Sequence, residues 1–221
     1  MPVYTTKDLF DLSQSIAEPL LMKAQYPWEA LEGIGSFILQ LGPTLPADEY
    51  TNPAPEVWVA KTAKVAPTAA ITGPCIIGPE AEIRHCAFIR GNAIVGSGAV
   101  VGNSTELKNS ILFNGAQVPH YNYVGDSILG YKAHMGAGAI TSNLKSDKTP
   151  VCMKAADEEL PSGRKKVGAL VGDFVEVGCN SVLCPGTILG RGCMVYPTSC
   201  VRGQVPANSI WKVSGDIVLK K

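Results

Sequence analysis

The histidines are the first residues of this sequence to consider for chemistry, because an imidazole can move a proton at neutral pH. There are three, His85, His120 and His134. A single histidine inside a core-forming segment is more often structural than catalytic. His120 differs in its polar neighbours, the run Gln117-Val118-Pro119-His120-Tyr121-Asn122-Tyr123-Val124-Gly125-Asp126. It is therefore the strongest candidate for acid–base chemistry.

Two cations precede it, Arg90 and Lys108, separated by 18 residues. Both side chains bind phosphate, and a guanidinium can do so through two parallel hydrogen bonds. Whether the two cations lie side by side depends on the elements that position them, and hence on the periodicity of the chain.

A six-residue repeat runs through most of the sequence. Steps of six meet nine aliphatic residues in succession, Val59, Val65, Ile71, Ile77, Ile83, Ile89, Val95, Val101 and Leu107. The residue four positions later is small in the first eight steps, from Ala63 to Thr105. A second run comprises Val171, Val177, Leu183, Leu189, Val195 and Val201. This period fits neither a helix nor a plain strand, and it is typical of short strands joined by sharp turns.

Three such hexads close one coil, and stacked coils lie about 4.8 Å apart, the spacing of neighbouring strands in a sheet. A solenoid of this kind stacks Arg90 directly on Lys108. Like charges so close repel each other, so the pair fits a bound phosphate better than water alone. The alternative is that solvent screens both cations. The segment 108–141 keeps a looser register, with a five-residue step from Val124 to Leu129.

The repeat resembles that of the hexapeptide-repeat acyltransferases, whose fold is a left-handed parallel β-helix; the handedness comes from this resemblance. The segment 88–143 is similar to the acetyltransferase domain of the bifunctional enzyme that makes UDP-N-acetylglucosamine. In that family H-x-x-Y-x-G-D precedes G-A-G-x-I-T-x-N, and here these motifs begin at His120 and Gly136. The resemblance covers roughly residues 70–221 and extends to related sugar-1-phosphate nucleotidyltransferases.

The resemblance implies acetyl transfer from acetyl-CoA to the amine of an amino-sugar 1-phosphate, without a metal, in a homotrimer with sites between subunits. The general base falls on His120, and a backbone amide near Gly136–Gly138 would stabilise the oxyanion. The substrate-binding positions fall on Arg90, Lys108, Tyr123, His134, Asn143 and Lys148. The positions expected near acetyl-CoA are Gly138, Cys179, Pro197 and Arg164.

The sequence also departs from the family pattern. His134 stands where the family usually has a substrate-contacting Asn, and Leu144 where it has Tyr, which leaves the sugar open. A polar insertion at 142–170 resembles archaeal sugar-1-phosphate nucleotidyltransferase/acetyltransferases through Ser162-Gly163-Arg164-Lys165-Lys166. Long excursions from a rigid coil often carry function, although a solvated surface loop is the alternative. We expect the insertion to bring Lys148 and Arg164 near His120, beside Arg90 and Lys108.

The expected fold class is all-β, a left-handed parallel β-helix over 56–204 with the loop insertion at 142–170. Residues 1–42 predict a helical N-terminal cap, with Pro27 at a first helical position and Gly42 at a stop. We expect these helices to cover the open end of the solenoid, as solenoids require. Residues 43–55 read as a Pro-rich linker, and 205–221 as a C-terminal cap.

The composition excludes several classes of protein. Nineteen basic and nineteen acidic residues give no net charge, which argues against a dedicated nucleic-acid binder. The sequence has no apolar run long enough to span a membrane and no signal-peptide pattern at its start. Seven cysteines without a C-x-x-C pair fit free thiols in a reducing compartment, so we expect a cytoplasmic protein. Residues 1–55 contain no G-x-G-T-R loop, so we expect no nucleotidyltransferase activity from them.

Two other functions stay open. Left-handed β-helix carbonic anhydrases bind zinc through three histidines, and His85 lies 35 residues, about two coils, before His120. The third ligand fails, because that family has two histidines five apart and His134 lies 14 residues after His120. The changes at His134 and Leu144 also fit a non-catalytic or regulatory protein that binds a sugar nucleotide without turnover.

Overall fold

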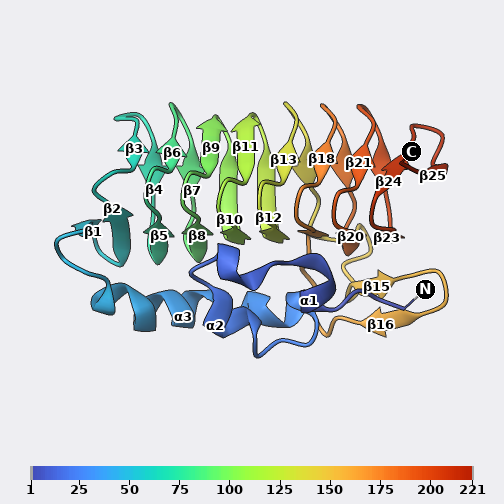
Figure 1. The fold of residues 1–221 in the computed structure, drawn as a ribbon, viewed down its shortest axis with the longest axis horizontal. Coiled ribbons are helices and arrows are strands. Elements are labelled where there is room, and N and C mark those ends of the chain that lie inside the picture. The colour runs from blue at the N-terminus through green and yellow to red at the C-terminus, as the bar shows by residue number, and fades with distance from the viewer. Residues whose placement is uncertain (1, 221) are drawn as a thin grey trace.

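The computed structural model describes residues 2–220 and shows short parallel strands stacked along one axis (Figure 1). Most coils place one strand on each of three faces. Face 1 holds β2 (Val57–Ala60), β5 (Cys75–Ile77), β8 (Ala93–Val95), the second halves of β10 (Glu106–Leu112) and β12 (Tyr123–Leu129), β17 (Ala169–Val171), β20 (Thr187–Leu189) and β23 (Gln204–Val205). The parallel β-helix expected from the repeat is thereby confirmed.

The other two faces complete each coil. Face 2 holds β3 (Lys64–Val65), β6 (Glu82–Ile83), β9 (Val100–Asn103), β11 (Gln117–His120), β13 (His134–Met135), β18 (Glu176–Val177), β21 (Met194–Val195) and β24 (Ser209–Trp211). Face 3 holds β4 (Ala70–Ile71), β7 (Phe88–Ile89), the first halves of β10 and β12, β14 (Ile140–Thr141), β19 (Val182–Leu183) and β22 (Cys200–Val201).

The predicted inner positions form the core. The aliphatic row from Ile77 to Leu107 and the row from Val171 to Val201 are buried inside the coils. Val65, in the first coil, is 39% exposed because no earlier coil covers it. Cys75 and Cys193 are buried free thiols at the small position, as expected, and burial raises the pKa of the Cys75 thiol to about 12. The narrow interior therefore explains the scarcity of aromatic residues.

Two coils in the middle of the solenoid are one residue short. The register of face 1 advances by 18 residues from Cys75 to Ala93, and then by 17 to Ser110 and again to Ser127. The deletion falls at the corner between faces 3 and 1, where Asn109 and Asp126 each adopt a φ of 48°. Asn and Asp tolerate this left-handed conformation better than most residues. The five-residue step from Val124 to Leu129 marks the second short coil, and the same step from Leu107 to Leu112, which sequence reasoning did not note, marks the first.

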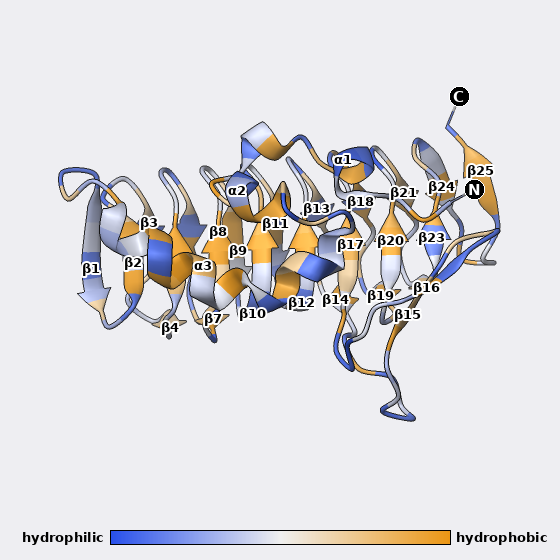
Figure 2. Ribbon diagram, turned by 90° about the horizontal axis from the view of Figure 1, so that it is seen from below, coloured by the Kyte–Doolittle hydropathy of each residue, from blue (hydrophilic) through white to orange (hydrophobic). Residues whose placement is uncertain are grey.

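The N-terminal segment was expected to cover the open end of the solenoid, but it lies along the side instead (Figures 1 and 2). Its short helices are α1 (Thr6–Leu9), η1 (Leu12–Gln14), α2 (Glu18–Leu21), η2 (Pro27–Glu32), α3 (Ile34–Leu41) and η3 (Gly42–Thr44). They pack on the outward-facing apolar residues of face 1. We call these residues the face-1 row; they are Ile76, Ile94, Ile111, Ile128, Leu170 and Ile188. These residues are fully buried, so the segment covers an apolar flank that water would otherwise reach.

Antiparallel strands close both ends of the solenoid, which changes two predicted boundaries. β1 (Tyr50–Ala54) lies within the predicted linker and pairs with β2, covering the edge strand of face 1. At the other end the parallel pairing continues to Trp211, past residue 204, and β25 (Ile217–Leu219) then pairs with β24. Both strands satisfy backbone groups that a bare sheet edge would leave unpaired.

The insertion after β14 is packed rather than fully solvated. It contains the hairpin β15 (Cys152–Lys154) and β16 (Glu159–Pro161), which lies beside the N-terminal segment (Figure 1). Val151 and Met153 are buried in the same apolar cluster as the N-terminal helices. The backbone N–H of Val3 donates to Glu158 Oε2 at 2.7 Å. The insertion and the N-terminal segment therefore form one continuous cover.

Candidate functional site

His120 ends β11 at the corner between faces 2 and 3, opposite the covered face 1, and its ring is exposed. Asn122, two residues later, is buried and ties the two sequence motifs together. Its Oδ1 accepts from the His120 backbone N–H at 3.1 Å, while its Nδ2 donates to the carbonyls of Gly136 and Ala139 at 2.8 and 2.9 Å. Sequence reasoning did not single out Asn122, although its polar side chain lies within the first motif.

Three of the four predicted acetyl-CoA positions, Gly138, Cys179 and Pro197, lie in a column that begins at His120. The Gly138 N–H donates to the His120 carbonyl at 3.0 Å, and the Thr198 N–H donates to the Cys179 carbonyl at 2.8 Å. The register of face 2 stacks Cys179 beyond Ala137 and Pro197 beyond Cys179. Gly138, Cys179 and Pro197 therefore follow one another along the same corner of the solenoid.

The amides near Gly136–Gly138 are not equivalent. The Gly136 N–H donates to Val177 at 2.7 Å, and the Gly138 N–H is taken by His120. The N–H of Ala137 has no hydrogen-bond acceptor within residues 2–220. Ala137, and not its glycine neighbours, therefore offers a free donor directly beyond His120 in the column.

A polar network extends from face 3, around the corner from His120, to the corner between faces 3 and 1. Its centre is Asp126, which is 3% exposed. The Asp126 carboxylate accepts from Lys108 Nζ at 3.1 Å, Asn109 Nδ2 at 2.9 Å and Asn143 Nδ2 at 2.6 Å. Asn143 Nδ2 also donates to Tyr123 Oη at 3.1 Å. The network thus joins Lys108, Tyr123 and Asn143, three of the six predicted substrate-binding residues, through a carboxylate that was absent from the predicted set.

Arg90 lies beside this network, and the backbone register stacks it on Lys108 as expected. Neither cation lacks a counterion, however. Arg90 Nη1 pairs with Glu106 Oε1 at 2.6 Å and Lys108 pairs with Asp126, so mutual repulsion no longer argues for a phosphate. The hydrogen bond to Glu106 raises the pKa of Arg90. Burial raises the pKa of the Tyr123 phenol, and the carboxylates of Glu106 and Asp126 add to that rise.

Gly125 leaves room for this packing. A Cβ at this position would lie 2.5 Å from Tyr123 Oη and 2.8 Å from Asn143 Nδ2, so both side chains would have to shift to accept it. The glycine of the H-x-x-Y-x-G-D motif therefore makes room for the Tyr123–Asn143 hydrogen bond.

Three predicted site residues lie elsewhere in the chain. His134 faces outward on face 2, where its Nδ1 lies 2.9 Å from Glu176 Oε2. Lys148 lies in the exposed turn of the insertion. Arg164 pairs with Glu32 of η2 at 3.4 Å, on the side that covers face 1. The expectation that Arg164 gathers near His120 is therefore wrong, because His120 occupies the opposite corner.

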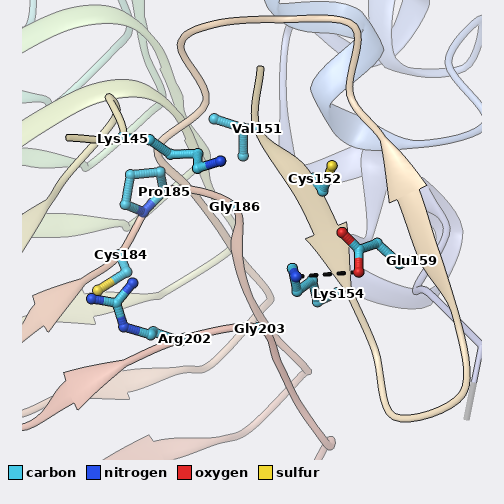
Figure 3. Close-up of a pocket in the computed structure, with 10 residues that line it drawn as sticks. All are labelled: Lys145, Val151, Cys152, Lys154, Glu159, Cys184, Pro185, Gly186, Arg202 and Gly203. Carbon is cyan, nitrogen blue, oxygen red and sulfur yellow. Dashed lines mark ion pairs between the residues drawn. The ribbon is translucent and has the colours of Figure 1, made fainter. Parts of the chain in front are cut away.

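A cavity of about 360 Å³ lies between the hairpin β15–β16 and the last coils (Figure 3). Lys145, Cys152, Cys184 and Arg202 are among the residues that line it. An adjoining cavity of about 450 Å³ shares Lys145, Cys184 and Arg202 with the first. By register, Cys184 and Arg202 continue the corner that carries Arg90 and Lys108. Both cavities therefore lie at the edge of face 3 away from His120.

A family model for the GMPPB C-terminal domain matches residues 71–211, more than half of the chain. The chain belongs to this family. Residues of the matched GMPPB C-terminal domain include His120, its column and the network around Asp126, whereas the helices of the N-terminal segment lie outside it.

Two relatives of this chain are longer proteins. The chain is 34% identical over 110 residues to the "Bifunctional sugar-1-phosphate nucleotidylyltransferase/acetyltransferase" of Sulfurisphaera tokodaii, which covers 50% of this chain and 27% of the relative. It is 31% identical over 135 residues to the "Bifunctional protein GlmU" of Methanococcus maripaludis, which covers 61% of this chain and 33% of the relative. The chain therefore spans about a third or less of these proteins.

Among solved structures, the acetyltransferase domain of PglB from Neisseria gonorrhoeae aligns with 81% of this chain and 64% of its own, at 15% identity and a TM-score of 0.34. The UDP-N-acetylglucosamine acyltransferase of Francisella novicida aligns with 72% of this chain and 68% of its own, at 12% identity and a TM-score of 0.40.

Between residues 2 and 220, no three His, Cys, Asp or Glu side chains gather in a way that would hold a metal ion. None of the helices in this part of the chain combines the length and the apolar character needed to cross a bilayer.

Proposed function

We propose that this protein is an acyltransferase that moves the acetyl group of acetyl-CoA to the amine of an amino-sugar 1-phosphate, such as glucosamine 1-phosphate. The observation that carries the proposal is the position of His120. It lies at a corner with the Gly138–Cys179–Pro197 column along one direction and the Lys108–Asp126–Asn143–Tyr123 network around the other side. The name of one relative, "Bifunctional sugar-1-phosphate nucleotidylyltransferase/acetyltransferase", supports it.

In the proposed reaction, the amine nitrogen attacks the thioester carbonyl carbon and His120 takes a proton from the nitrogen. The new C–N bond forms, the C–S bond breaks, and CoA leaves with a proton as the free thiol. The free N–H of Ala137 would stabilise the oxyanion of the tetrahedral intermediate. Arg90, Lys108 and Tyr123 would hold the phosphate and sugar. None of these roles uses a metal.

We further propose a homotrimer with the sites between subunits. His134 lies on face 2, away from the face-3 network of its own chain. It would reach a sugar only in the site of a neighbouring copy. Light scattering coupled to size-exclusion chromatography would measure the mass, and a monomer that retains full activity would contradict this part of the proposal.

The test is a CoA-thiol release assay with acetyl-CoA and a panel of amino-sugar 1-phosphates. His120→Ala should lower kcat by about 100–10,000-fold, the usual contribution of a general base. His85→Ala is the matched control, because His85 precedes His120 by two coils along the same side and should leave kcat unchanged. Full activity in His120→Ala would overturn the mechanism. Sugar-phosphate binding without turnover on any acceptor would favour the non-catalytic alternative.

A further inference from the structure

We infer that Asp126 sets the hydrogen-bonding polarity of the candidate sugar site by fixing Asn143, so that the substrate must present a hydrogen-bond donor, a free hydroxyl or amine, to Asn143 Oδ1. This inference rests on the proposed function for the identity of the ligand, but not for the arrangement of the network.

The first step is the burial of Asp126. Its carboxylate is nearly inaccessible to water and receives hydrogen bonds from Lys108, Asn109 and Asn143. A buried carboxylate without partners is costly, so all three donors are held in place by its charge. The shortened corner between faces 3 and 1 directs Asp126 toward these donors.

The second step concerns the orientation of the Asn143 amide. A carboxylate only accepts hydrogen bonds, so the atom of Asn143 that faces Asp126 must be the nitrogen. The same Nδ2 also faces Tyr123 Oη, and its two hydrogens are thereby both used. Asn143 Oδ1 accepts no hydrogen bond from residues 2–220, and it remains the acceptor available to a ligand.

The third step follows from the neighbours of Asn143. Tyr123 Oη accepts from Asn143, so its own hydrogen is free to donate. The Lys108 ammonium has three hydrogens, and within residues 2–220 it donates only to the Asp126 carboxylate, so it keeps donors for a ligand. The network therefore offers donors at Lys108 and Tyr123, which suit phosphate or hydroxyl oxygens, and a single acceptor at Asn143.

The substrate class follows from this polarity. A phosphorylated amino sugar carries anionic oxygens for the donors and several hydroxyls, one of which would donate to Asn143. A fluorine in place of that hydroxyl cannot donate, and Asn143 cannot turn over without placing two acceptors against each other at Asp126. Sites built around a substrate hydroxyl reject analogues that lack it, because a polar group is left unpaired.

The experiment compares glucosamine 1-phosphate with its 3-, 4- and 6-deoxyfluoro analogues in wild type, Asp126→Ala and Asp126→Asn. Wild type should discriminate against one analogue by about 100-fold or more in kcat/KM. Asp126→Ala removes every acceptor, frees the Asn143 amide to turn, and should reduce that discrimination below about 10-fold. Asp126→Asn keeps one acceptor oxygen and should retain most of it, and KM for acetyl-CoA should change in neither variant.

Asp173→Ala is the matched control, since Asp173 is equally buried but binds the N-terminal segment and Arg191. Its loss should lower stability without changing the discrimination. The inference is overturned if wild type tolerates all three analogues, or if the discrimination survives in a folded Asp126→Ala variant.

A second measurement separates this inference from the proposed function. If wild type acetylates no amino sugar, the proposed function fails, but the Asn143 side-chain amide can still be followed by NMR. Slow hydrogen exchange of this amide in wild type and Asp126→Asn, and fast exchange in Asp126→Ala, would support the inference. Equal exchange in all three would overturn it.

Discussion

Ile111→Ala tests whether the N-terminal segment covers face 1. Ile111 lies between Ile94 and Ile128 in the face-1 row and is fully buried. In a bare solenoid its side chain would point into water, and truncation would change stability by no more than about 0.5 kcal/mol. Under the N-terminal helices the same change opens a cavity, and Ile→Ala in a packed core costs about 2–5 kcal/mol.

Thermal unfolding can therefore distinguish an Ile111 buried under the N-terminal helices from one exposed to water. For a domain of this size 1 kcal/mol corresponds to a Tm change of about 2–4 °C, so we expect Ile111→Ala to lower Tm by about 4–20 °C. Ile217→Ala is the matched control, because Ile217 is 42% exposed on β25, and its Tm should stay within about 2 °C of wild type.

Limited proteolysis provides a second measurement on the same variants. Ile111→Ala removes contacts with the N-terminal helices, so cleavage within residues 10–45 should become faster, while cleavage of the coils should not. Equal Tm values for Ile111→Ala and Ile217→Ala would refute the reasoning, and the N-terminal segment would then have to pack elsewhere.

Three further predictions concern the site and its support. Gly125→Ala should raise KM for the sugar phosphate by roughly 10–100-fold and leave KM for acetyl-CoA unchanged, because the new methyl group displaces Tyr123 and Asn143; an unchanged sugar-phosphate KM would contradict the steric argument. Subtracting the ultraviolet titration curve of Tyr123→Phe from that of wild type isolates the Tyr123 phenol. This phenol should ionise above the ordinary pKa of 10.0, since burial raises the pKa of Tyr123, and a phenol that ionises at or below 10.0 would contradict this direction. Burial also raises the pKa of the Asp173 carboxyl group. The folded state therefore binds a proton at Asp173 more tightly than the unfolded state does. Protonation of Asp173 then stabilises the folded state as the pH falls through the raised folded pKa toward the ordinary 3.8. The Tm of wild type minus the Tm of Asp173→Asn should therefore increase on acidification, and a decrease would contradict this sign.

The solenoid itself could be predicted because its rule is local. Every sixth residue faces the interior, and Ile77, Ile83 and Ile89 are buried by the coils immediately before and after them. The position of the N-terminal segment could not be predicted in this way. Its signal was present in triplets such as Cys75-Ile76-Ile77, where the middle residue is apolar although a lone solenoid would expose it.

The site residues likewise fall into those that the sequence predicted and those that only the structure identified. His120, Tyr123 and Asn143 were found because they belong to sequence motifs with fixed spacing. Asp126 belongs to the same motif, but its part in the site depends on the shortened corner that buries it and on the donors that converge on it from other coils. Ala137 was hidden for a similar reason, because only the hydrogen bonds of its neighbours leave its N–H free.

By itself the sequence determined the repeat, the inner rows of the coils and the motif residues around His120, since each depends on residues near one another in the chain. Tertiary structure alone decided which flank the N-terminal segment covers, that Arg164 is held against Glu32, and that Asp126 controls Asn143. The physical reason is that burial and hydrogen-bond partners are shared between coils and segments far apart in sequence, and a periodic pattern specifies the inside of a solenoid but not what covers its outside.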